Sequence, residues 1–157
     1  MDASSYGSRP DYLPRFMTDC QGEAAQNILA LDYADSRQLA AESLNRFPAR
    51  NSCELDWSTV PYLEQHWCAD DEAWAALAAQ LFAPYVAEES LVVLFWGNFI
   101  IPTVVLPADL LVRYAWEIQD AEPGFWLYPL DGDVLIECLP DGKVTAAAIP
   151  GPQPTRP

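Results

Sequence analysis

Basic side chains are scarce in this chain of 157 residues, which has one Lys, seven Arg and one His against 23 Asp and Glu. Between residues 51 and 142 there are 16 acidic residues and a single basic one, Arg113. Contacts to phosphate groups need Lys or Arg, so this composition argues against nucleic-acid binding. A protein with such a negative field instead attracts positively charged partners and steers their association.

Catalytic signatures are also missing. The chain has no G-x-S-x-G, no Gly-rich phosphate loop and no G-x-G-x-x-G. The only histidine, His66, needs a partner that orients its ring, and Glu64 serves only if this segment is extended. We therefore expect His66 to be a partly buried structural residue. Acidic pairs such as Asp70-Asp71 arise by chance among 23 carboxylates. We expect a protein that is not an enzyme.

Metal-ligand spacing is absent as well. No two of Cys20, Cys53, Cys68 and Cys138 form the C-x-x-C pair of a structural zinc site, and His66 lies in an H-x-C instead. The segment 131–133 begins like a calcium loop but continues as an apolar strand. We expect no metal and no other cofactor, and cysteines that act as small buried hydrophobic residues.

No hydrophobic run is long enough to cross a membrane. The longest covers about residues 91–106 and is interrupted by Gly97, Asn98 and Pro102. The first residues, MDASSYGSRPDY, lack the basic and apolar regions of a signal peptide. We expect a cytoplasmic protein without a membrane partner.

The chain does have the apolar content of a folded domain. Hydrophobic residues make up 51% and aromatic residues 12% of it, so the acidic residues must lie on a folded surface rather than in a disordered acidic tail. We expect an irregular N-terminal arm over residues 1–17 and one α+β domain over residues 18–149. The four prolines after residue 149 predict a flexible tail over residues 150–157.

Hydrophobic periodicity changes from helical to extended near residue 90. Helical spacing and end signals predict helices over 22–31, 36–47, 70–82 and 107–119, with a short helix over 62–67. Extended runs predict strands over 90–96, 99–106, 125–130, 134–139 and 143–149.

Three two-residue turns connect the expected strands: Gly97-Asn98, Asp131-Gly132 and Asp141-Gly142. Pro102 cannot donate to a strand ladder, so it places the strand over 99–106 at a sheet edge. The expected fold is α+β: N-terminal helices, then a five-stranded, mainly antiparallel sheet in β-β-α-β-β-β order, with the helices packed on one face.

Over residues 70–149 the chain resembles bacterial toxin-immunity proteins, the cytoplasmic antidotes to contact-dependent, type VI-secreted and bacteriocin toxins. The resemblance lies in small size, an acidic α+β fold, and the segments SLVVLFWGNFIIPTVVLPADLLVRYAWEI and FWLYPLDGDVLIECLPDGKVTA. It implies that the protein binds a cognate toxin domain 1:1 and occludes its active site. A toxin that cuts nucleic acid has a basic cleft, which an acidic surface fits.

Acidic residues in turns and helix ends of the second half, with two tryptophans as anchors, are the candidate partner-binding residues. A tryptophan within a charged patch is typical of an interface hot spot. The candidates are Glu88, Glu89, Trp116, Asp120, Glu122, Trp126, Asp131, Asp133 and Asp141. Two alternatives remain open: an acidic chaperone or adaptor for a secreted effector, and a hydrolase that uses paired carboxylates, with or without a divalent metal.

Overall fold

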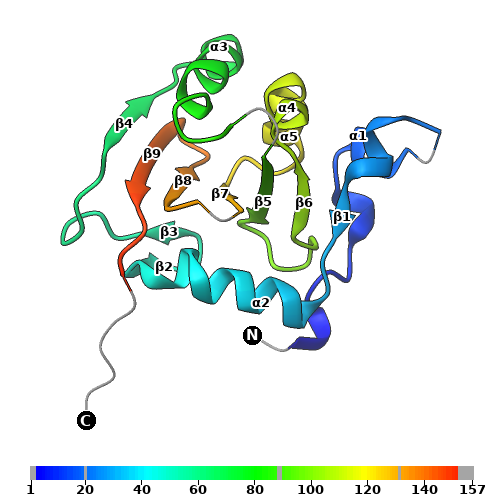
Figure 1. Ribbon diagram of the computed structural model, residues 1–157, viewed down its shortest axis with the longest axis horizontal. Coiled ribbons are helices and arrows are strands. Elements are labelled where there is room, and N and C mark those ends of the chain that lie inside the picture. The colour runs from blue at the N-terminus through cyan, green and yellow to red at the C-terminus, as the bar shows by residue number, and fades with distance from the viewer. Residues whose placement is uncertain (1–2, 20, 88–89, 131, 152–157) are drawn as a thin grey trace.

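A seven-stranded antiparallel sheet forms the centre of the protein in a computed structural model that describes residues 3–19, 21–87, 90–130 and 132–151 (Figure 1). The strand order is β1-β6-β5-β7-β8-β9-β4, and β2 and β3 form a separate antiparallel hairpin. The strands are β1 (Leu29–Ala30), β2 (Ala49–Asn51), β3 (Glu54–Leu55), β4 (Glu64–Trp67), β5 (Leu91–Trp96), β6 (Val104–Pro107), β7 (Phe125–Pro129), β8 (Val134–Cys138) and β9 (Lys143–Ala148).

Helices lie on both sides of this sheet, with α3, α4 and α5 on one side and α2 with the β2–β3 hairpin on the other (Figure 1). The helices are α1 (Arg15–Thr18), α2 (Tyr33–Glu42), α3 (Asp71–Phe82), α4 (Ala108–Arg113) and α5 (Ala115–Ala121). Short 3-10 turns complete the described structure: η1 (Ala3–Ser5), η2 (Pro10–Tyr12), η3 (Ala24–Asn27) and η4 (Leu44–Arg46).

Strict alternation along the central strands divides the core into two clusters. Val92, Leu94 and Ile136 belong to the larger cluster, which α3, α4 and α5 cover. Val93 and Leu135 belong to the smaller one, which α2, η4 and the hairpin cover. Because successive side chains of a strand point to opposite faces, a strand buried on both faces is apolar throughout.

The α+β class and the mainly antiparallel sheet are confirmed, but two details of the prediction are wrong. The sheet has seven strands rather than five, because β1 and β4 add to its two edges. Helices do not all pack on one face, since Leu39, Ala40 and Leu44 of the α2 region pack against the smaller cluster.

Both added strands come from segments predicted as helices. Residues 22–31 form η3 and β1, and residues 62–67 contain β4, which pairs with β9 from Glu64 to Trp67. Gly97-Asn98 is not a two-residue hairpin: residues 97–103 connect β5 to β6, and Gly97 N–H donates to the Gly124 carbonyl (2.7 Å). The strand at 104–107 is not an edge either, because β1 pairs with it.

The helix predicted over 70–82 is present as α3. The Asp70 side chain accepts a hydrogen bond from the Ala73 backbone N–H (2.8 Å), as an N-cap carboxylate does. The helix expected from residue 36 begins earlier, as α2, and its N-cap is Asp32, whose carboxylate accepts a hydrogen bond from the Asp35 N–H (2.8 Å). Ser36 is instead buried, where its hydroxyl shares a hydrogen bond with that of Thr103 (2.6 Å).

Candidate partner-binding surface

Three of the nine predicted binding residues meet on one helix. Trp116 and Asp120 lie on exposed positions of α5, and Glu122 is the C-cap residue that follows it. Trp116 and Asp120 are four positions apart, so they are neighbours on the same face of the helix. Glu117 shares this face, and the Trp116 side chain is 44% exposed.

The local sequence explains why this face points outward. Leu110, Leu111, Ala115 and Ile118 are buried and hold α4 and α5 on the sheet, so the positions between them face solvent. At the junction of the two helices, the Tyr114 backbone N–H donates a hydrogen bond to the Leu110 carbonyl (2.9 Å). We give the name acidic helical surface to five exposed side chains together with the half-buried Glu122. The exposed residues are Asp109, Val112, Trp116, Glu117 and Asp120.

Electrostatic pairing on this surface is weak. Residues 108–122 contain four carboxylates and one arginine, Arg113. Within the described part of the chain, the ion pairs between a carboxylate and an arginine are Arg9–Asp11 (2.8 Å) and Arg50–Glu54 (3.6 Å), and neither lies here. The charge of the acidic helical surface is therefore available to a partner.

The remaining acidic candidates do not join this surface as one group. Asp141 lies in the β8–β9 turn, where its carboxylate accepts the Lys143 N–H (3.0 Å). Asp133 lies at the opposite end of β8, next to Ile149, whose N–H donates to the Asp133 carbonyl (2.8 Å). Glu88, Glu89 and Asp131 lie outside the described residues.

Trp126, the other predicted anchor, faces the interior, unlike Trp116. Its side chain is 6% exposed and packs in the smaller core cluster. The indole N–H donates to Glu137 (2.9 Å), the residue directly opposite on β8. This bond satisfies the indole N–H inside the protein.

Glu137 is a buried carboxylate that the sequence analysis missed. It has no exposed surface and also accepts hydrogen bonds from the Leu55 N–H (2.8 Å) and the Trp57 indole N–H (2.8 Å). The carboxylate thereby connects the β2–β3 hairpin and the segment after it to the sheet.

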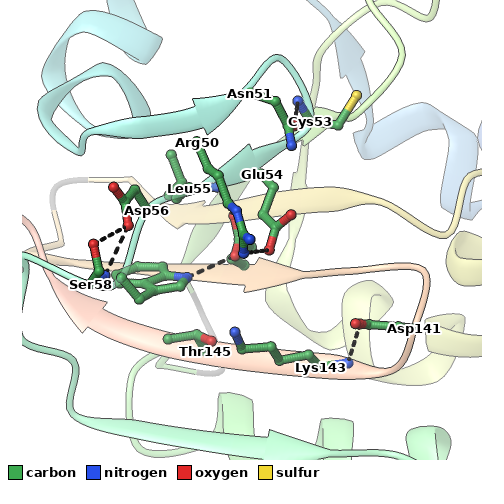
Figure 2. Close-up of polar contacts among 12 residues, drawn as sticks. Arg50, Asn51, Cys53, Glu54, Leu55, Asp56, Ser58, Asp141, Lys143 and Thr145 are labelled. Atoms are coloured by element: carbon green, nitrogen blue, oxygen red, sulfur yellow. Dashed lines mark hydrogen bonds and ion pairs between the residues drawn. The ribbon is translucent and has the colours of Figure 1, made fainter.

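Figure 2 shows Arg50, Glu54 and Leu55 on the hairpin and Lys143 and Thr145 on a strand of the main sheet, β9. Burial raises the pKa of the Glu137 carboxyl above its ordinary value, and the hydrogen bonds from Trp126, Trp57 and Leu55 oppose that shift. The sequence feature that could have indicated this buried carboxylate is the single charged residue, Glu137, within the otherwise apolar strand VLIEC.

His66 and Glu64 both lie on the extended strand β4. Because they are two positions apart, their side chains lie on the same face and can contact each other. The Nε2 atom of His66 is 3.1 Å from a Glu64 carboxylate oxygen, and the Tyr85 hydroxyl donates to the other oxygen (2.7 Å). The Tyr85 bond, with a smaller effect of His66, lowers the pKa of Glu64, while burial and Glu64 raise the pKa of Tyr85 to about 12. Glu64 is the one described side chain bonded to His66, and the Tyr85 bond joins β4 to the segment after α3.

A second exposed apolar group lies along the sheet edge at β4. Tyr62, Leu63 and Trp67 are exposed there, and Trp67 is the most exposed of the six tryptophans at 65%. The Lys143 ammonium lies 5.6 Å from the Trp67 ring, within the range of a cation–π contact.

The cysteines differ from one another. Cys138 is buried, as predicted, and burial raises the pKa of its thiol, but Cys53 is exposed, which the prediction did not anticipate.

Among the described residues, no group of three or more His, Cys, Asp or Glu side chains is placed to hold a metal ion. None of the helices in the described ranges has the length and apolar character to span a bilayer.

Comparison with protein-family models and with curated protein sequences found no match to this chain.

Proposed function

We propose that this protein is a toxin-immunity protein that binds a basic cognate toxin domain and inhibits it without catalysing a reaction. The observation that carries the proposal is the acidic helical surface, where the exposed Trp116 shares α5 with Glu117 and Asp120, and no carboxylate of this surface pairs with an arginine among the described residues. An aromatic anchor within a charged rim has the composition of an interface hot spot.

The charge of the whole chain supports the same function. A net charge of −15 destabilises a folded domain through self-repulsion. The same negative charge, however, helps a protein to capture a basic partner quickly. Steered association of this kind reaches about 10⁸ M⁻¹s⁻¹ or more at low salt and falls as salt screens the charges.

Affinity capture followed by inhibition tests the proposal. The protein is immobilised in lysate of its native cells at low and high salt, and the retained basic partner is then produced on its own. Expressed alone, that partner should stop growth of a host cell, and co-expression of the immunity protein should restore growth. A partner that stays toxic in the complex, or is released active, would instead indicate the chaperone or adaptor alternative.

Two variants locate the interface. Trp116→Ala should weaken binding about 10- to 100-fold, the loss typical of a hot-spot side chain. The pair Asp120→Lys and Glu122→Lys should slow association at low salt by roughly tenfold. Asp19→Lys with Glu23→Lys makes the same charge change on exposed residues near the N-terminus and serves as the matched control. Unchanged affinity in both helical variants would show that the partner binds elsewhere.

A further inference from the structure

A partly open cavity of about 660 Å³ lies on the other side of the sheet from the acidic helical surface. Its walls come from α2, from Ser5 and Tyr6 near the N-terminus, and from the end of β5 with the segment that follows it. Cavities of about 300–1,000 Å³ are the usual size of small-molecule sites. The cavity is therefore large enough to enclose an organic ligand.

Aromatic side chains form much of its lining. Phe95 and Trp126 are buried, so they present fixed ring surfaces from the sheet. Tyr6, Tyr33 and Phe99 contact one another edge to face, with ring centroids 5.3–6.2 Å apart. Rings that brace one another lose little freedom when a ligand binds, so this lining is prepared for a flat apolar group.

The polar lining of the cavity includes one cation and two side-chain amides but no acidic residue among the described residues. Arg37 lines it from α2 and forms no ion pair with any described carboxylate. Asn45 and Asn98 also line it, and since the Asn98 side-chain oxygen already accepts the Ile100 N–H (3.3 Å), its amide N–H groups are left to donate. None of the described lining residues is Asp or Glu, although the chain has 23 of them.

We propose that this cavity binds a small aromatic carboxylate, a ligand independent of the toxin partner. Its ring would lie against Phe95 and Trp126, and its carboxylate would accept hydrogen bonds from Arg37, with Asn45 or Asn98 as further donors. The guanidinium group presents donors in a fork that matches a carboxylate. Arg37 is exposed, so it stays hydrated without a ligand, but only an anionic ligand can form an ion pair with it, and a cationic ligand would be repelled.

Isothermal titration calorimetry with 2-naphthoate and 2-naphthamide tests the proposal. The two probes share one ring system and differ in charge, so their affinity ratio measures the contribution of the carboxylate. Titrations at about 0.15 M salt limit the repulsion of an anion by the net negative protein, because the Debye length is then about 8 Å. We expect 2-naphthoate to bind 1:1, and at least about tenfold more tightly than the amide, the ratio typical of one charge-assisted hydrogen bond.

Arg37→Gln should abolish this preference, since glutamine keeps a polar side chain but removes the charge. Arg15→Gln is the matched control, because Arg15 is exposed on α1 and does not line the cavity. Both variants should retain the far-ultraviolet circular dichroism of the original protein. The proposal is overturned if 2-naphthoate does not bind at millimolar concentration, if the amide binds equally well, or if Arg37→Gln keeps the full preference.

Discussion

Replacing Glu137 with alanine should lower the free energy of unfolding by about 2–4 kcal/mol. The substitution leaves the N–H groups of Leu55 and Trp126 buried without their acceptor, and each such donor costs about 1–3 kcal/mol. Trp57 is only partly buried, so its indole N–H regains water at a smaller cost. The substitution also removes the desolvation cost of a buried carboxylate. The total loss of stability is therefore smaller than the sum of the costs of the unpaired donors.

Glu137→Gln should be milder, at about 1–2 kcal/mol, because the amide oxygen still accepts hydrogen bonds while the NH₂ group faces one of the donors. Glu54→Gln is the matched control in the neighbouring hairpin. Its partner Arg50 is largely exposed and 3.6 Å away, so this change should cost less than about 1 kcal/mol. Urea unfolding followed by circular dichroism gives all three values. A loss below about 1 kcal/mol for Glu137→Ala would refute the assigned role of the carboxylate.

The pH dependence follows from the raised pKa of Glu137. Because the folded-state pKa lies above the ordinary value of 4.5, the folded protein holds this proton to higher pH than the unfolded chain does. The contribution is complete below the unfolded pKa and is lost as pH rises through the folded pKa. The stability difference between the original protein and Glu137→Gln should therefore shrink from pH 4 toward pH 7. Urea titrations across this range measure it, and a difference that grows with pH would show a lowered pKa instead.

Three further substitutions test single features of the fold, each by the same urea titration. Asp70→Ala removes the N-cap of α3 and should cost about 1 kcal/mol, whereas Asp70→Asn should retain most of that stability. Gly142→Ala should cost more than about 1 kcal/mol, because Gly142 has a φ of +91° and an added Cβ would collide with the Cys68 carbonyl oxygen. Ser36→Ala should cost about 1–3 kcal/mol by orphaning the Thr103 hydroxyl, and adding Thr103→Val should restore part of it. An equal or larger loss in that double variant would contradict the hydrogen-bond account.

The elements that local sequence specifies were predicted best. α3 has its own cap at Asp70 and its own apolar stripe, and both are present in the fold. The predicted turn at 141–142 connects β8 to β9 because a glycine at positive φ is what a tight turn there requires. Strands β5, β7, β8 and β9 were predicted within two residues of their ends, since long apolar runs identify strands buried on both faces.

The exposure of the binding candidates was harder to predict, because it depends on which residues pack across the sheet. Trp116 and Asp120 share the open face of α5, as helical spacing allows. Trp126 looked equally suited to an interface from its acidic neighbours in sequence, but Glu137 lies opposite it on β8 and accepts its indole N–H. Pairing across a sheet joins residues that no local pattern connects.

The sequence by itself determined the α+β class, the antiparallel second half and the strongly negative charge, because periodicity, turn residues and composition are local properties. Only the tertiary structure decided the two edge strands, β1 and β4. Each is short, lacks a strong pattern of its own, and forms through hydrogen bonds to β6 or β9. The tertiary structure also decided that Glu137 is buried and that Arg37 lines a cavity to which no described Asp or Glu contributes. A side chain's solvation and partners are set by the segments that pack around it, and these lie far away along the chain.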